Sequence, residues 1–189
     1  AGRATSDVRD GQSSCAGTGP RCIWGRCLRD ISHKAQSPEE FASLESYDDQ
    51  VTYNLVSAAS EVLELSPVDV LQSFGKYWIH NIASKHYADL MSKTGTSFER
   101  FISNLDHMHS RIQATFPNYK PPSFRVKKLE SGLLQVDYYS EREGLLPFVE
   151  GLFIGLGEYF EMKLHIEHVA DDAHPMPCQR MNIQFEECT

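Results

Sequence analysis

Residues 98–140 read FERFISNLDHMHSRIQATFPNYKPPSFRVKKLESGLLQVDYYS, and this stretch decides the fold. In its first half, apolar residues recur every three or four positions, which predicts one long helix with a single apolar stripe. The stripe comprises Phe98, Phe101, Ile102, Leu105, Met108 and Ile112. Pro117, Pro121 and Pro122 should end this helix, because proline lacks a backbone N–H and disfavours helical conformation in the residue before it. Beyond the prolines apolar and polar residues alternate, which predicts strands.

The alternating pattern occurs in four runs, with a helical segment in the middle. The runs are SFRV (123–126), LLQVDYYS (133–140), MKLHIEHV (162–169) and RMNIQF (180–185). Between the second and third runs, residues 145–156 return to helical spacing. The sequence therefore predicts a four-stranded antiparallel sheet with a helix between strands 2 and 3.

The residues before this stretch predict further helices. Ser37-Pro38-Glu39-Glu40 is typical of a helix start, with a capping serine, a proline and acidic residues in the first turn. Apolar residues then recur at helical spacing over 51–63 and, after Ser66-Pro67, over 70–78. Helices followed by a sheet in this order indicate the α+β class.

Residues 1–36 differ from the rest of the chain. They are rich in Gly, Ser and Arg and show no sustained helical or strand period. We expect a divergent or poorly ordered N-terminal segment over 1–36, followed by a single domain over 37–189.

Composition argues against several classes of function. The 189 residues carry a formal net charge of −8, so the surface should repel nucleic acid and anionic lipid. No apolar run approaches the roughly 20 residues that a membrane-spanning helix requires. The five cysteines are an odd number without framework spacing, and Ala1 begins no secretory signal, so we expect a reducing, cytoplasmic setting.

His109 lies on the apolar helix stripe, and two interpretations of it are open. A neutral imidazole in such a place suits an axial ligand of haem iron. It equally suits a core histidine whose ring nitrogens are hydrogen-bonded. His107 is a formal rival as a ligand, but it lies about 200° around the helix from His109 and off the stripe.

Tyr138, Ser140 and Arg142 form a second group of candidates. A strand places alternate residues on one face, so it would align this phenol, hydroxyl and guanidinium in a row. Such a row suits carboxylates, because Arg grips a carboxylate with two hydrogen bonds and Tyr and Ser add neutral donors. The alternative is an ordinary solvent-facing strand surface. Haem would use both groups of candidates, since it presents one iron for a histidine and two propionates for such a row.

Together these motifs resemble the H-NOX (haem nitric oxide/oxygen binding) family, which includes bacterial stand-alone sensors and the haem-bearing beta subunit of soluble guanylate cyclase. The resemblance rests on LDHMHSRIQATFPNYKPPSF (105–124) and VDYYSEREGLLPFVEGL (136–152). SYDDQVTYNLVSAASEVL (46–63) and FGKYWI (74–79) also match, and the resemblance runs from about residue 39 to about residue 186. It implies haem b buried between the helical and sheet parts of the fold.

The resemblance assigns proximal roles to five residues. His109 matches the family's iron ligand. The propionate-binding motif is matched by Tyr138, Ser140 and Arg142. Pro122 matches a proline that presses on the porphyrin and distorts it, and such distortion is one way in which a protein tunes haem.

Two further residues match the distal pocket, where the gas binds. Trp78 and Phe148 occupy these positions, and neither offers the tyrosine hydroxyl that stabilises bound oxygen in some family members. The resemblance therefore implies that the chain binds NO and CO, with weak or no stable oxygen binding.

The function implied is gas sensing without catalysis. The resemblance implies that NO weakens the iron bond opposite to it, here the bond to His109, and that release of this bond is the switch. The effector would be a guanylate cyclase, a histidine kinase or a diguanylate cyclase, as a partner or a fused domain, and YYSEREGL (138–145) favours a cyclase. We expect a minimal sensory module whose effector is absent.

Three alternatives remain open. One is a haem-free H-NOX-like interaction module, because family members normally begin with an apolar Met-Tyr-Gly helix that residues 1–36 do not show. Retention of His109 with the whole propionate motif argues against it. A haem peroxidase would need a distal His/Arg pair, which the pocket segment lacks. A zinc site is the third, although its candidate ligands match no standard zinc-finger spacing. These ligands are His165, His168, His174, Cys178 and Cys188.

Overall fold

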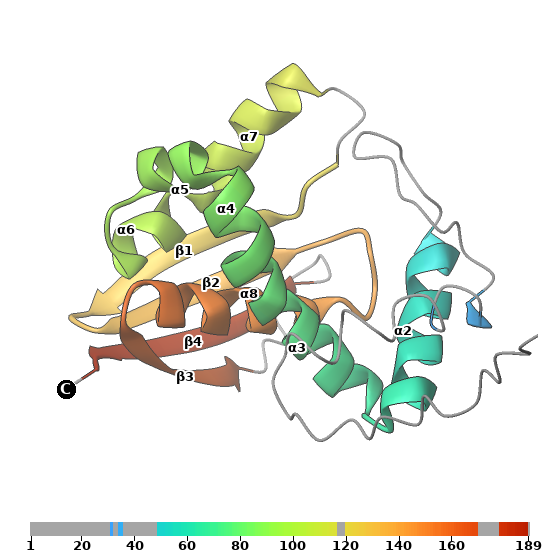
Figure 1. The fold of residues 1–189 in the computed structure, drawn as a ribbon. Helices are drawn as coiled ribbons and strands as arrows, with labels where there is room; N and C mark the ends of the chain where they lie inside the picture. Colours follow the sequence, from blue (N-terminus) through green and yellow to red (C-terminus); the bar gives the residue numbers. More distant parts are fainter. Residues whose placement is uncertain (1–30, 32–33, 36–48, 117–119, 170–177, 189) are drawn as a thin grey trace, which may run out of the picture.

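Helices and sheet occupy separate layers of the molecule in the computed structural model (Figure 1). The structure describes residues 31, 34–35, 49–116, 120–169 and 178–188. The helical elements are α2 (Asp49–Leu63), α3 (Pro67–Trp78), the π-helix η1 (Ile79–Ala83), α4 (Ser84–His86), α5 (Ala88–Thr94), α6 (Phe98–Ser103), α7 (Leu105–Thr115) and α8 (Leu146–Tyr159). The strands are β1 (Ser123–Glu130), β2 (Leu133–Tyr139), β3 (Met162–Val169) and β4 (Cys178–Glu187).

The four strands form one antiparallel sheet in the order β1-β2-β4-β3. Alternation along β2 places Leu134, Val136 and Tyr138 on the buried face. On this face α8 packs through Val149, Phe153 and Leu156, and the two layers share the main hydrophobic core. The predicted α+β class, the four strands and the helix between strands 2 and 3 are all confirmed.

The cap predicted before the second helix is present. The Ser66 hydroxyl accepts a hydrogen bond from the Asp69 backbone N–H at 3.1 Å, and Pro67 is the first residue of α3. A serine cap satisfies an N–H that the first turn of a helix leaves unpaired, and proline has no N–H to lose there. The helix start predicted at Ser37 lies outside the described residues.

The prediction of one long helix over residues 98–112 is wrong at one position. The structure has two helices, α6 and α7, which meet at Asn104. The Asn104 side-chain amide donates to the Thr94 carbonyl at 2.7 Å, and its backbone leaves the helical conformation with φ −98° and ψ 2°. An asparagine side chain that bonds to the backbone competes with the helix, which explains the break. The apolar stripe nevertheless continues across the break at Asn104. Its members on both sides are buried, namely Phe98, Phe101, Ile102 and Leu105.

Helices α3 and α8 cross at very close range, which two glycines permit. A Cβ at Gly75 would lie against the backbone of Phe148 and Leu152, and a Cβ at Gly151 would lie against the backbone of Gln72. The glycines therefore let the two backbones approach more closely than any other residue would. This crossing fixes the position of α3 over the sheet, together with Trp78 at its end.

Three described residues lie within the predicted divergent segment. Ile31 and Ala35 are buried in a second cluster with Ala58, Ala59 and Val70. Lys34 forms an ion pair with Glu61 of α2. No helix in the described part of the chain is long and apolar enough to cross a membrane.

Candidate functional site

The predicted iron ligand, His109, lies on α7 and faces the start of β1. Its Nδ1 is 3.2 Å from the backbone carbonyl oxygen of Pro122. A carbonyl can only accept, so Nδ1 carries the proton and Nε2 keeps a free lone pair. A hydrogen bond from the second ring nitrogen is the usual way in which a protein fixes the orientation of a ligating histidine.

The environment of His109 keeps its imidazole neutral. Burial lowers the pKa of His109 below its usual range, and this outweighs the opposing effects of the Pro122 carbonyl and of Asp106. A neutral imidazole is the form that binds a metal ion.

Asp106, one turn before His109, joins α7 to β1. Its carboxylate Oδ1 accepts from the Phe124 backbone N–H at 3.0 Å and from the Ser123 hydroxyl at 2.9 Å. These bonds hold Pro122, the residue before β1, beside the His109 ring. Sequence reasoning missed Asp106, because an acidic residue in the first turn of a helix is ordinarily explained by the helix dipole alone.

Aromatic rings extend from His109 into the core. The Phe124 ring lies 5.8 Å from His109, 5.4 Å from Tyr138 and 5.9 Å from Phe153, measured between ring centroids. Phe124 and Tyr138 are partners across β1 and β2. A half-buried imidazole nitrogen bordered by apolar rings is a donor set that would fit a porphyrin with one iron.

The predicted propionate-binding motif is placed differently from the sequence prediction. Only Tyr138 lies within a strand, because β2 ends at Tyr139; Ser140 and Arg142 follow it in the connection to α8. The Ser140 hydroxyl accepts from the Arg142 backbone N–H at 3.0 Å. Tyr138 is buried and Arg142 is exposed, so the three do not form one row on a strand face.

Arg142 already holds a carboxylate. Its guanidinium Nε is 2.5 Å from Asp49 Oδ1, and its Nη2 donates to the Thr52 hydroxyl at 3.1 Å. Beside it, the Tyr53 hydroxyl donates to the Glu143 carbonyl at 2.9 Å. These contacts join the connection after β2 to the first turns of α2. The contact between the Arg142 guanidinium and a carboxylate is of the same kind that a haem propionate would make.

Trp78 and Phe148 lie on the crossing helices α3 and α8. The Trp78 ring stacks on Tyr87 at 6.4 Å, and the Phe148 ring stacks on Phe74 at 5.4 Å. Among the described residues no ring contact joins either of them to His109. Their predicted place on the distal side therefore stays a prediction.

The model of the Haem-NO-binding (HNOB) family matches residues 24–168, which is most of the chain. The chain belongs to this family. The match begins before residue 37, where the sequence analysis placed the start of the domain.

Solved H-NOX structures share the fold. An H-NOX protein from S. oneidensis in the Fe(II)NO state has a TM-score of 0.72 at 19% identity, with 88% of this chain and 90% of that chain covered. A mutant of T. tengcongensis H-NOX has a TM-score of 0.74 at 16% identity, with 89% and 93% covered. The protein is therefore an H-NOX domain in fold as well as in sequence.

The curated relatives are longer proteins. The rat guanylate cyclase soluble subunit beta-2 is 31% identical over 91 residues, which are 48% of this chain and 13% of that protein. The soluble guanylate cyclase gcy-35 of Caenorhabditis elegans is 26% identical over 132 residues, which are 69% of this chain and 19% of that protein. The part of this chain that matches thus spans less than a quarter of the length of each of these two proteins.

The remaining sequence candidates lie elsewhere in this H-NOX domain. His107 is exposed. His168 pairs with Glu150 of α8 at 2.5 Å, whereas His165 is exposed on the other face of β3. Within the described residues no three metal-binding side chains come together, and His174 lies outside them.

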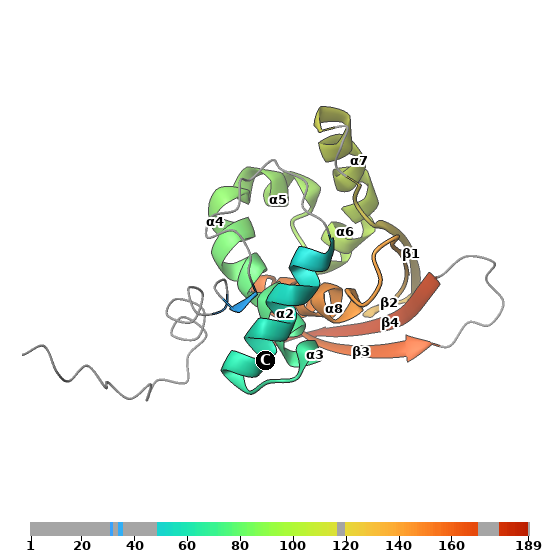
Figure 2. The same cartoon turned by 90° about the vertical axis from the view of Figure 1, so that its right-hand side faces the viewer.

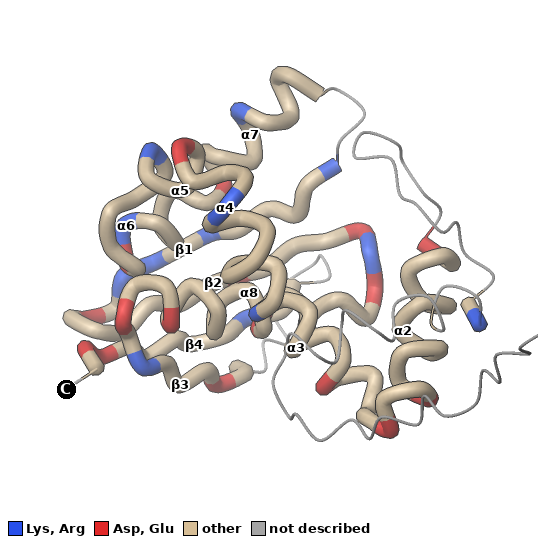
Figure 3. The backbone as a smooth tube through the Cα atoms, in the orientation of Figure 1, with Lys and Arg blue, Asp and Glu red and all other residues tan. Residues whose placement is uncertain are grey.

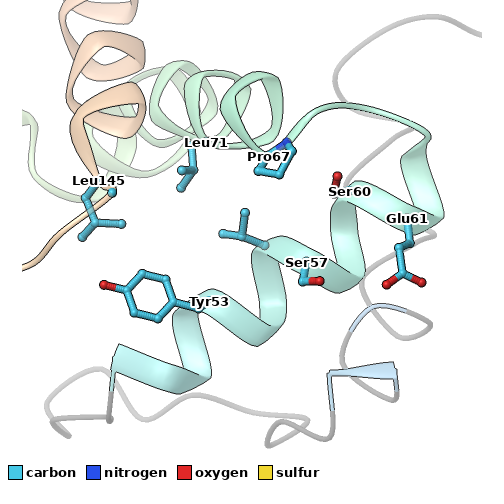
Figure 4. A pocket seen from close by; sticks show the side chains of 9 residues that line it. Tyr53, Ser57, Ser60, Glu61, Pro67, Leu71 and Leu145 are labelled. Carbon is cyan, nitrogen blue, oxygen red and sulfur yellow. The ribbon is translucent and has the colours of Figure 1, made fainter.

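A cavity of about 310 Å³ lies between α2, α3 and the start of α8 (Figure 4). Tyr53, Leu71 and Leu145 contribute to its mostly apolar lining. None of the predicted site residues lines it, so it is separate from the surroundings of His109.

Proposed function

We propose that this H-NOX domain is a haem-based gas sensor that binds NO and CO at ferrous haem b, with His109 as the protein ligand of the iron. One observation carries the proposal: Nδ1 of His109 donates to the Pro122 carbonyl, so the neutral ring keeps the Nε2 lone pair for a metal. When bound, haem supplies the iron at which these gases bind.

Three residues would hold the haem propionates. Arg142 is the main cation, and its present contact with Asp49 is chemically equivalent to a contact with a propionate. Ser140 is fixed to the Arg142 backbone, so the two would act together. Tyr138 would add its hydroxyl from the buried face of β2.

Pro122 and the distal residues would adjust the haem and the choice of gas. Pro122 lies against the His109 ring through its carbonyl and would press on the porphyrin from the same side. Phe148 has no polar hydrogen to donate to bound oxygen, and Trp78 has only its indole N–H. We expect the reduced protein in air to show no stable oxy spectrum.

His109 would transmit the response to the rest of the protein. Its ring is bonded to Pro122, and its helix is bonded through Asp106 to Ser123 and Phe124. Weakening or loss of the His109 bond to iron would therefore release both α7 and the start of β1. The domain would perform no catalysis itself and would act on an effector. A guanylate cyclase suits its relatives best, and a histidine kinase or a diguanylate cyclase is the alternative effector.

The test replaces the imidazole. His109→Gly should abolish the Soret absorption of the purified protein or leave it dependent on added imidazole, so that without imidazole no spectral change on NO remains. His107→Gly is the matched control, because His107 lies exposed on the same helix. Unchanged haem content and NO response in His109→Gly would contradict the proposal.

A second candidate is a haem-free interaction module that keeps the H-NOX fold. The specific observation in its favour is that Arg142 is already paired with Asp49 and Thr52. The same spectra decide between the two, since this module would take up no haem even when haem is supplied during expression.

A further inference from the structure

Strand β3 forms one edge of the sheet (Figures 1 and 2). Among the described strands it pairs only with β4, and in both views no described helix lies along its other side. An edge strand presents unpaired backbone N–H and C=O groups to a neighbouring chain. The side chains of β3 therefore decide which kind of strand could pair with this edge.

The two faces of β3 have different side chains. Lys163, His165 and Glu167 are exposed on the outer face, so the strand carries both signs of charge (Figure 3). Leu164 and Ile166 point toward the core, yet both are only partly buried. The apolar layer of the sheet is thus left incompletely covered at this edge.

We propose that β3 is a dimerisation edge, at which a second copy of this chain adds its own β3 antiparallel about a two-fold axis at His165. In this register Lys163 lies opposite Glu167 of the second copy, and the same pair forms again across the axis. Leu164 lies opposite Ile166 of the second copy and extends the apolar layer. Opposite charges and apolar pairs at facing positions stabilise antiparallel strands.

Neighbouring registers are less favourable, which makes the pairing specific. In an antiparallel pair, facing residues have their side chains on the same face of the sheet. The two-fold axis must therefore pass through a residue of β3 and cannot lie between two residues. An axis at Leu164 places Lys163 opposite His165 and Met162 opposite Ile166, so the ion pairs between Lys163 and Glu167 are lost. An axis at Ile166 places Lys163 opposite Val169 and Leu164 opposite His168, so the ion pairs are lost.

The present contacts of these side chains leave the edge accessible. Lys163 is 3.5 Å from Glu186, and both side chains are more than two-thirds exposed, so this pair is weak and exchangeable. His168 is drawn toward α8 by Glu150. A closed two-fold pairing of this kind would also protect an edge that could otherwise add further chains.

The first test is a charge swap, with the full chain studied by sedimentation over a concentration series. Lys163→Glu or Glu167→Lys alone should weaken the dimer roughly tenfold, because each places like charges opposite one another twice. The double variant Lys163→Glu/Glu167→Lys should restore it. Lys127→Glu, an exposed lysine on the opposite edge strand, is the control with the same charge change.

The second test fixes the register. His165→Cys should give a disulfide-linked dimer under mild oxidation, since residues facing each other in antiparallel strands have Cα atoms about 4.5–5.5 Å apart. Lys163→Cys should not, because residue 163 faces residue 167 of the second copy. The native chain, oxidised in the same way, is the control for cross-linking through its own cysteines.

Two outcomes would overturn the proposal. One is a native chain that stays monomeric over the whole concentration series. In that case β3 would bind a different protein or no partner at all. The other is a dimer that both single reversals leave intact. Circular dichroism of each variant checks that these exposed substitutions leave the fold unchanged.

Discussion

Arg142 and Asp49 form an ion pair, with Nε and Oδ1 2.5 Å apart, that joins the connection after β2 to the first turn of α2. The side chains are 43% and 44% exposed, so the pair contributes little to stability by itself. Its importance lies in competition, because the arginine proposed to hold a haem propionate is held by a carboxylate of the protein. Haem uptake would then require exchange of one carboxylate for another.

Replacing Asp49 should therefore strengthen haem binding. We expect Asp49→Asn to slow the transfer of haem to an acceptor apoprotein by several-fold, because Arg142 no longer has a charged competitor. Thr52→Val removes only the neutral partner and should have a smaller effect. Faster haem loss in Asp49→Asn would instead show that Asp49 positions Arg142 for the propionate.

Removing the Asp106 carboxylate should loosen α7 from β1. Asp106→Ala loses two hydrogen bonds, one from a partly buried backbone N–H, and should lower the free energy of unfolding by roughly 1–2 kcal/mol. Asp106→Asn keeps one acceptor oxygen and should lose less. Urea denaturation of the haem-free protein measures both. Equal stability of all three proteins would show that α7 does not depend on this carboxylate.

A methyl group at the α3–α8 crossing should be strongly destabilising. In Gly151→Ala the new Cβ meets the Gln72 backbone, which cannot move without separating the helices, so we expect a loss of roughly 1–3 kcal/mol. Gly144→Ala is the comparison, because it has open space and only a φ of +72° to oppose it. It should cost about 1 kcal/mol. Thermal unfolding should rank the two variants in this order.

The contribution of Glu158 to stability should depend on pH. Burial would raise the pKa of Glu158, but hydrogen bonds from Lys76 and His80 at 2.6 and 2.8 Å outweigh it and lower the pKa below its usual range. A lowered pKa in the folded state stabilises the protein above the unfolded value and loses this effect as the pH falls. Glu158→Gln should thus cost less than about 1 kcal/mol at neutral pH, since the group is 44% exposed, and progressively less at an acidic pH below the usual pKa of a glutamate. Denaturant curves at the two pH values test this.

Local patterns were sufficient to predict the architecture. The serine and proline before α3, the alternation in the four strands and the spacing in α8 each reflect a local physical rule, and each element is present. The break between α6 and α7 was missed because it depends on Thr94, a residue ten positions away whose carbonyl binds the Asn104 side chain. Spacing along one helix contains no information about such a contact.

The sequence predicted part of the arrangement of the candidate site residues and missed the rest. His109 lies beside Pro122, and Tyr138 joins them through the Phe124 ring. The straight row through Ser140 and Arg142 was wrong, because the chain leaves the strand at Tyr139 to reach α8. Asp49 and Asp106 were missed because their partners lie 93 and 18 residues away along the sequence.

The oxygen that orients His109 belongs to the main chain at residue 122 rather than to a side chain. A different amino acid at that position would still present a carbonyl, as long as the chain entered β1 along the same path. Evolution could therefore vary the side chain that we propose presses on the haem, while the direction of the His109 imidazole is preserved. In the proposed site, the distortion of the haem and the orientation of its histidine ligand would thus depend on different atoms of a single residue.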